Sequence, residues 1–165
     1  MEVNTDKKAE PSGNIPETVG REDEERLARE AMAVRLHAYA PYSHFFVGAA
    51  LLGSDGKIYT GCNIENASYP AGICAERSAF ASAVSAGCRR FLAIAIAGGP
   101  EDKDRASGRT AVLPECPPCG ICRQFMREFC GNRFPVILVT SEKQFRTVTL
   151  GTLLPDSFGP DVLSL

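Results

Sequence analysis

The chain has 165 residues, of which 44% are hydrophobic and 23% charged, and this balance excludes a fully disordered, collagen-like or coiled-coil protein. Its 18 basic and 20 acidic side chains give a net charge of −2, so the chain as a whole has no electrostatic attraction to nucleic acid or to an anionic membrane. One compact domain with a small or neutral partner is therefore expected.

Residues 1–21 are polar and contain Pro11 and Pro16, and we expect a flexible tail there, followed by one folded domain over 22–165. The tail has no apolar stretch of the kind that a secretory signal needs. The longest apolar runs, such as 91–97, are far shorter than the roughly 20 residues of a membrane-spanning helix. The expected location is the cytoplasm.

From Glu22 onward, apolar residues recur at helical spacing and predict a helix that ends before Pro41. Two short strands are predicted at 47–52 and 57–63, and Asp55-Gly56 between them favours a tight antiparallel hairpin. Residues 75–86 predict a buried helix that Gly87 ends in a left-handed conformation, and 91–97 predict a strand covered on both faces.

Residues 98–118 read as a long polar loop, and 121–130 predict a third helix, again ended by a glycine, Gly131. Strands are predicted at 135–140 and at 145–150, the second with the alternation of an edge strand, and a short C-terminal turn or helix follows. Helices between buried strands predict an α/β fold: a three-layer α-β-α domain around one mixed five-stranded sheet.

Seven cysteines need an explanation, because cytosolic thiols stay reduced and a disulfide framework prefers an even number. Three of them, Cys74, Cys119 and Cys122, lie at two predicted helix starts, where ligands gather in α/β sheets. The Cys119-x-x-Cys122 spacing lets two sulfurs reach one ion, and the positive helix ends lower the pKa of the thiols. Three ligands rather than four predict an open zinc site that keeps a position for water.

Glu76 follows Cys74 by two residues, so its carboxylate can face the metal without binding it. A carboxylate in that place can take a proton from a metal-activated water and return it to a leaving group. Arg77 and Arg123, each next to a ligand, are candidates to donate hydrogen bonds to the sulfurs.

Other interpretations stay open at this point. Cys-x-x-Cys alone also fits a redox pair, half of a structural zinc site or two buried thiols. A fourth thiolate from Cys116 or Cys62 would close the site and make it structural. Cys88 and Cys130 are expected to be plain core or surface thiols.

The chain resembles one family closely, the small free-nucleoside cytidine deaminases, over about residues 22–161. The Cys-Ala-Glu and Pro-Cys-x-x-Cys motifs follow the general pattern of zinc deaminases. The resemblance rests on five blocks in the family's order: 41–45 with 47–50, 61–67, 74–77, 118–124, and 153–155 with 158–160.

The resemblance implies a role for each of these positions. It implies one Zn²⁺ per chain on Cys74, Cys119 and Cys122, with Glu76 carrying the proton. Ribose hydroxyls are expected on Asn63 and Glu65, and the base edge on backbone groups around Ala75 and the 68–73 loop. Further residues follow from the same resemblance: Phe45 packing on the nucleoside, Phe158 stacking on the base from a neighbouring subunit, and Arg77 and Gln124 supporting the ligands.

The implied activity is the hydrolytic deamination of cytidine and 2′-deoxycytidine to uridine and 2′-deoxyuridine with release of ammonia, in pyrimidine salvage. This is the reaction of a hydrolase acting on the C–N bond of a cyclic amidine. The implied assembly is a homotetramer with active sites near subunit interfaces, with no nucleic acid or membrane partner. Alternatives are a deaminase of a modified cytosine nucleoside such as blasticidin S, a polynucleotide deaminase, and a catalytically silent zinc-binding interaction domain. Phe46 and the extended 98–117 loop depart from the family pattern.

Overall fold

The computed structural model describes residues 19–100 and 112–163. In chain order the elements are α1 (Arg21–Arg35), β1 (Phe45–Gly53), β2 (Ile58–Cys62), the 3-10 turn η1 (Tyr69–Ala71), α2 (Ala75–Ser85), β3 (Phe91–Pro100), α3 (Gly120–Phe129), β4 (Pro135–Ser141), β5 (Gln144–Thr149), α4 (Leu150–Leu153) and the 3-10 turn η3 (Pro160–Val162). The expected tail lies outside the described residues as far as 18, so its boundary stays a prediction. No helix in 19–100 or 112–163 is both long and apolar enough to cross a bilayer.

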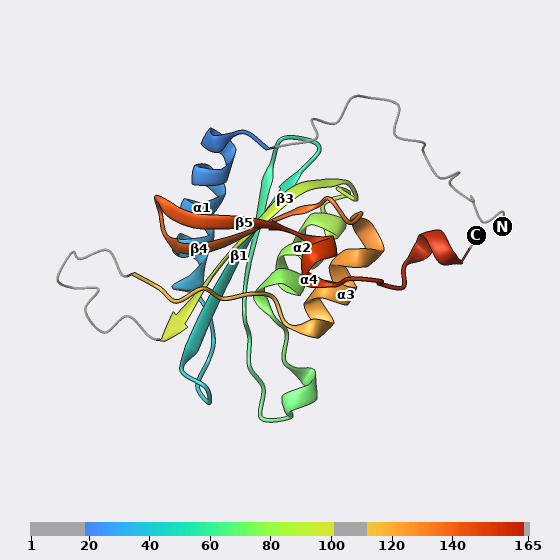
Figure 1. Cartoon of the computed structure of the whole chain (residues 1–165). Coiled ribbons are helices and arrows are strands. Elements are labelled where there is room, and N and C mark those ends of the chain that lie inside the picture. Colours follow the sequence, from blue (N-terminus) through green and yellow to red (C-terminus); the bar gives the residue numbers. More distant parts are fainter. Residues whose placement is uncertain (1–18, 101–111, 164–165) are drawn as a thin grey trace.

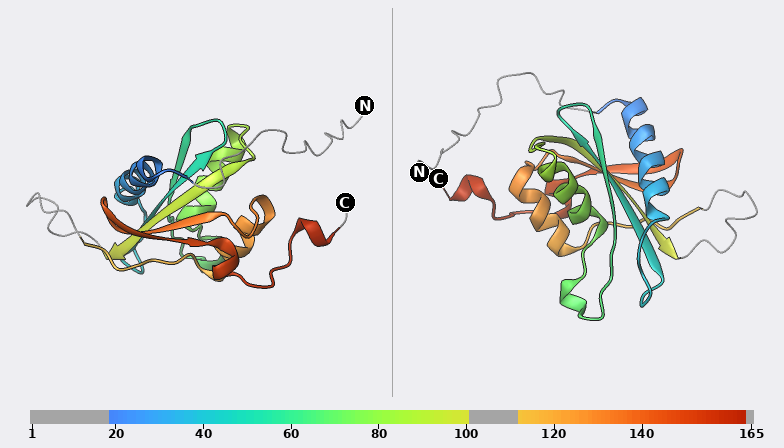
Figure 2. Two further views of the ribbon diagram at one scale, coloured as in Figure 1. Left: turned by 45° about the horizontal axis from the view of Figure 1, so that its top comes forward. Right: turned by 180° about the vertical axis from the view of Figure 1, so that it is seen from behind.

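The five strands form one sheet in the order β2-β1-β3-β4-β5. The β3–β4 pair is parallel, and the other three pairs are antiparallel. Helix α1 covers one face, and α2 and α3 cover the other (Figure 1), an arrangement also visible from behind in Figure 2. The predicted three-layer α/β fold with a mixed five-stranded sheet is therefore confirmed.

Alternate residues of the strands feed two separate cores, as the period of two along a strand requires. Ala49 and Leu51 of β1 pack with α2 and α3, whereas Ala50 and Leu52 pack with α1. The central strand β3 divides in the same way, which explains why its sequence is apolar without a break.

Two details differ from the sequence-based expectations. Strand β3 continues to Pro100, where it pairs with Phe45, so the polar loop begins later than expected, and residues 101–111 of it lie outside the described residues. Among the described glycines, Gly56 and Gly87 have the predicted positive φ, but Gly131 does not. The predicted Gly131 cap is wrong because Cys130 is already extended and the Gly131 carbonyl accepts a bond from Phe134 N–H as the chain turns into β4.

The topology brings two helix starts to one edge of the sheet. Helix α2 follows β2 and α3 follows β3, and these two strands run in the same direction because each is antiparallel to β1. Both helices therefore begin at the carboxyl ends of their strands, where ligands bind in α/β sheets.

Candidate metal centre and adjoining pocket

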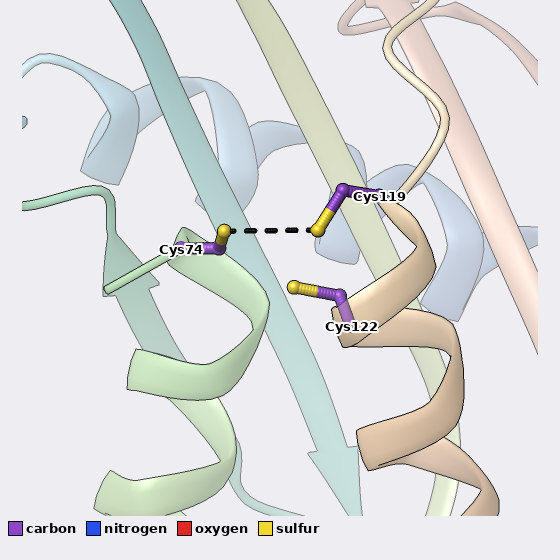
Figure 3. A group of neighbouring side chains, drawn as sticks. All are labelled: Cys74, Cys119 and Cys122. Atoms are coloured by element: carbon purple, nitrogen blue, oxygen red, sulfur yellow. Dashed lines mark hydrogen bonds between the residues drawn. The ribbon is translucent and has the colours of Figure 1, made fainter. Parts of the chain in front are cut away.

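Three cysteine side chains meet at the two helix starts. Cys74 and Cys119 are the N-cap residues of α2 and α3, and Cys122 lies in the first turn of α3. Their sulfurs all lie within 4.8 Å of one another, and Cys74 and Cys119 are 3.9 Å apart. Figure 3 shows the three side chains pointing toward one point between the helices. This spacing fits a single ion with three thiolate ligands.

The electrostatics of the cluster favour a thiolate. Donation from the Cys122 thiol lowers the pKa of Cys74 to about 5, with smaller contributions from Arg77 and Cys119. The same bond raises the pKa of Cys122, because a second negative charge beside the first is unfavourable. A divalent cation removes this conflict by accepting all three sulfurs as thiolates.

Arg77 independently indicates that a metal ion belongs between the three cysteines. Its Nη2 donates to the Gly72 carbonyl at 3.3 Å, but its Nε is buried and has no hydrogen-bond partner within the described part of the chain. The Cys74 and Cys122 sulfurs also raise the pKa of Arg77. A buried donor beside metal thiolates is the partner that such ligands use to spread their charge, so the residues present fit a zinc ion.

Glu76 is the one buried carboxylate at the centre. It lies in the first turn of α2 and is 4% exposed. Burial raises its pKa, and the negative charge of Cys74 adds to that effect. A carboxyl group with a raised pKa can both accept and donate a proton near neutral pH.

A cavity of about 670 Å³ opens beside the cysteines. Its wall includes Cys74, Cys119 and Glu76 of the metal centre, and also Asn63, Glu65 and Ala75. This volume lies within the range of small-molecule sites in proteins, which are typically about 300–1,000 Å³.

Asn63 and Glu65 are both fixed by hydrogen bonds, Asn63 to the start of β1 and Glu65 to the residues just before it. The Asn63 amide donates to Phe45 O at 2.9 Å and accepts from Val47 N–H at 2.8 Å. Glu65 accepts from Tyr42 N–H at 2.9 Å, from Ser43 N–H at 3.2 Å and from the Ser43 hydroxyl. The Ser43 hydroxyl is the main reason that the pKa of Glu65 lies below its usual value.

The two candidate aromatic residues lie outside this wall. Phe45 is 37% exposed, and its ring faces Gly98 of β3. Phe158 is 57% exposed in the segment after α4 and does not line the pocket of its own chain. An aromatic contact from Phe158 to a bound ligand would therefore have to occur in another chain's pocket.

Two residues next to the ligands make contacts other than those expected. Arg123 donates to the Pro118 carbonyl at 2.7 Å and to the Leu153 carbonyl at 2.8 Å, so these bonds go to backbone oxygens and not to the sulfurs. Gln124 donates to the Phe158 carbonyl at 3.0 Å. Both side chains link the ligand helix α3 to the C-terminal segment.

The remaining cysteines stand apart from the cluster. Cys116 lines the pocket, and burial raises its pKa to about 11, whereas Cys62 is half-buried outside the pocket. Neither belongs to the metal-binding group found among the described residues, which leaves three ligands. Cys88 and Cys130 are buried in the core on the side of α2 and α3, as expected.

Several pocket residues were not identified as ligand contacts from the sequence. They are Tyr42, Tyr69, Ile64 and Ile121, and Ser43 is the partner of Glu65. Tyr42 and Ser43 stand in the Pro-Tyr-Ser-His-Phe block, and Tyr69 in the 68–73 loop, so their positions carried a signal. Their contacts depend on the fold and could not be read from spacing.

Comparisons with known proteins agree with this geometry. The family model of the cytidine and deoxycytidylate deaminase zinc-binding region matches residues 21–138. The cytidine deaminase of Sporosarcina psychrophila is 44% identical over 142 residues, which cover 86% of this chain and 96% of that protein.

Solved structures of cytidine deaminases are also similar to this chain. The crystal structure of cytidine deaminase from Burkholderia pseudomallei has a TM-score of 0.69 and 44% identity, covering 81% of this chain and 97% of that one. That of Mycobacterium tuberculosis has a TM-score of 0.67 and 37% identity, covering 83% and 98%. With its three thiols and buried glutamate at two helix starts, the chain belongs to the zinc-binding cytidine and deoxycytidylate deaminase family.

Proposed function

We propose that this protein is a zinc-dependent enzyme that converts cytidine and 2′-deoxycytidine, with water, to uridine and 2′-deoxyuridine and ammonia. The observation that carries the proposal is the buried Glu76 carboxyl beside three convergent thiols at the end of a nucleoside-sized cavity. Family membership supports the same reaction.

The chemistry needs one proton carrier. Zinc bound to Cys74, Cys119 and Cys122 would supply a Lewis acid that lowers the pKa of a water toward neutrality. Glu76 would take a proton from the attacking water and deliver it to N3 of the ring as the oxygen bonds to C4. Glu76 would then carry a second proton from the new C4 hydroxyl to the amino group, so that the C4–N4 bond breaks, the C4 carbonyl forms and ammonia leaves.

In this proposal different residues of the pocket wall bind the base and the ribose of the substrate. The Ala75 backbone N–H has no partner within the first turn of α2, as for any helix start, so it is available to the base carbonyl. Asn63 and Glu65 retain acceptor and donor capacity for the ribose hydroxyls beyond their bonds to the chain. Phe158 stacks on the base from a neighbouring subunit, whereas the ring of Phe45 lies outside the pocket wall and would have to turn from Gly98 to pack against the nucleoside.

Two further residues support this arrangement. Arg77 offsets the negative charge of the thiolates with its guanidinium, whose Nε is buried. Gln124, two residues after Cys122 on the ligand helix, donates a hydrogen bond to the carbonyl of Phe158.

The proposal also includes an oligomeric state and a cellular location. The exposed Phe158 outside its own pocket favours a homotetramer with shared sites, so native mass spectrometry is expected to give four times the chain mass, and a single-chain mass would contradict this. All seven cysteines are free thiols, which favours a reducing cytoplasm and a role in pyrimidine salvage. Residues 22–165 form the catalytic unit in this proposal, and 1–21 its tail.

The deciding experiment follows the ultraviolet absorbance of cytidine mixed with purified protein of known zinc content. Uridine and ammonia are confirmed as products, and Glu76→Gln and Glu76→Ala are assayed in parallel. We expect the wild type to turn over and Glu76→Gln to keep its zinc while losing at least about 10²–10⁴-fold in kcat, because its amide cannot carry a proton.

Near-normal turnover by Glu76→Gln would remove this residue from the mechanism. If zinc is bound but cytidine, deoxycytidine and blasticidin S are all unchanged, the protein is a zinc-binding domain without this activity.

A further inference from the structure

Arg127 is a charged side chain that is almost fully buried, where it loses most of its hydration. It lies in the last turn of α3 and is only 9% exposed. Burying a guanidinium requires compensating partners, and the proposed chemistry does not use this residue. Its partners therefore indicate what it does.

Those partners all belong to the C-terminal segment. Arg127 Nε donates to the Ser157 hydroxyl at 3.0 Å, and its Nη2 pairs with the Asp161 carboxylate at 2.5 Å. Gly159 lies directly against the guanidinium, since a Cβ at that glycine would come within 2.5 Å of Arg127 Cζ. A charged donor with two oxygen partners is a strong and directional anchor.

Phe158 stands between these anchoring points. Its neighbours Ser157 and Gly159 contact Arg127, and its own carbonyl accepts from Gln124, three residues before Arg127 on the same helix. The backbone of Phe158 is thus fixed on both sides, while its ring projects into solvent, 57% exposed. In Figure 1 the C-terminal segment runs alongside α3 before it leaves the domain.

We propose that Arg127 is a positioning residue that locks residues 157–161 onto the ligand helix and so presents the Phe158 ring to the nucleoside base in a neighbouring chain's pocket. This inference rests on the proposed function, in which Phe158 serves that pocket. Because α3 carries both Cys119 and Cys122 at its start, the clamp ties the aromatic ring to the same rigid helix as the metal.

Two variants disturb the clamp from opposite sides. Arg127→Ala removes the anchor, and Gly159→Ala adds a methyl group where the guanidinium lies. The matched controls are Arg29→Ala, at an exposed position of α1, and Gly131→Ala, where an added Cβ meets nothing within 4 Å.

The first readout is hydrogen exchange of the C-terminal peptide, followed by mass spectrometry, and it does not depend on activity. The amides of Val162 and Leu163 bond to Gly159 and Pro160 in η3, so loss of the clamp is expected to speed their exchange by about tenfold or more. Peptides of β1 and β3 should keep their wild-type exchange in both variants.

The second readout separates KM from kcat. We expect Arg127→Ala and Gly159→Ala to raise KM for cytidine by about tenfold with kcat changed less than about twofold, because an aromatic contact to the base is weakened and the reacting groups are not. Combining Arg127→Ala with Phe158→Ala should add nothing to the KM of Phe158→Ala alone, since Arg127 acts through that ring.

The outcomes are distinct. Unchanged exchange in both variants would show that no clamp exists and would overturn the inference. Faster exchange with unchanged KM, or full additivity with Phe158→Ala, would overturn the presentation of the ring. If the wild type does not turn over cytidine, the proposed function fails with that presentation, while the exchange experiment still decides whether Arg127 holds the segment.

Discussion

Where β2 ends, the side-chain amide of Asn63 takes the place of a backbone amide in the hydrogen bonding to β1. It bonds to Phe45 and Val47 on the neighbouring strand, as another residue of β2 would, and Asn63 N–H also donates to Val47 O. The position of Asn63 in the pocket wall is therefore fixed by the sheet itself. Binding groups that are fixed in advance lose less conformational entropy when a ligand arrives.

Asp55 and Tyr59 form a comparable fixed pair in the β1–β2 hairpin, away from the pocket. The Tyr59 hydroxyl donates to the Asp55 carboxylate at 2.8 Å. This bond is the main cause of both pKa shifts: it lowers the pKa of Asp55 and raises that of Tyr59 to about 12. Each partner is thus held in the protonation state that the bond requires.

The stability from this bond depends on pH in a defined direction. A lowered pKa at Asp55 stabilises the fold above the ordinary value of 3.8, and this contribution is lost as pH falls through the folded pKa. A raised pKa at Tyr59 contributes below 10 and is lost as pH rises through about 12. We expect Tyr59→Phe to lower Tm between pH 5 and 9, and the deficit to shrink as pH falls below 3.8 and to disappear only below the lowered pKa of Asp55 in the folded protein; thermal unfolding across pH measures it. Tyr39→Phe, at an exposed tyrosine, should show no such dependence.

At the scale of the elements, Gly61 decides how closely α2 approaches the sheet. A Cβ at this residue of β2 would lie 2.6 Å from the Ala75 carbonyl and 2.8 Å from Ser78 C, and both neighbours are helix backbone that cannot rotate away. The first turns of α2 carry Cys74, Ala75 and Glu76 at their start. The absence of a Cβ at Gly61 therefore determines where Cys74, a proposed metal ligand, and Glu76, the proposed proton carrier, lie.

Gly61→Ala is expected to destabilise the protein by about 1–3 kcal/mol, the usual cost of overpacking, and to lower kcat, because the start of α2 must move away from β2. Chemical unfolding and the cytidine assay measure the two effects. Gly20→Ala adds a methyl group where nothing lies within 4 Å and serves as the matched control. Wild-type stability in Gly61→Ala would show that α2 is not seated against this strand.

At the scale of the molecule, the metal joins two helices that also pack directly. Behind the cysteines, Phe80 of α2 contacts Phe125 and Phe129 of α3 and Phe91 of β3, with ring centroids 4.8–5.8 Å apart. This aromatic cluster holds α2 and α3 together independently of the thiols. Zinc therefore adds stability to an interface that already exists.

Removing zinc with a chelator is expected to lower Tm without unfolding the protein at room temperature. Binding to the folded state alone stabilises it by about 2.7 kcal/mol when free zinc is 100 times Kd. Circular dichroism during heating, before and after zinc is restored, measures the shift. Unfolding on chelation at 25 °C would contradict the role given to the aromatic cluster.

Much of this molecule could be predicted from local pattern, since the helices and strands follow from apolar periodicity and Gly56 and Gly87 from their turns. Cys74, Glu76, Cys119 and Cys122 were found because motif spacing and helix starts are local properties. The contacts of Arg123, Gln124 and Arg127 were not found because they join α3 to a segment about 30 residues later. Nothing near a residue in the sequence reveals such a partner.

The parallel pairing of β3 with β4 also bears on when the metal can bind during folding. Cys74 and Cys119 are 45 residues apart, and they meet only when α2 and α3 both lie on the same finished sheet. In a growing chain one of the three clustered thiols, Cys74, is made first, and the Cys119–Cys122 pair follows 45 residues later. Zinc capture is therefore expected to mark the end of folding rather than to start it, and a zinc-sensitive dye mixed into a refolding reaction would show the metal leaving solution after the strands have formed.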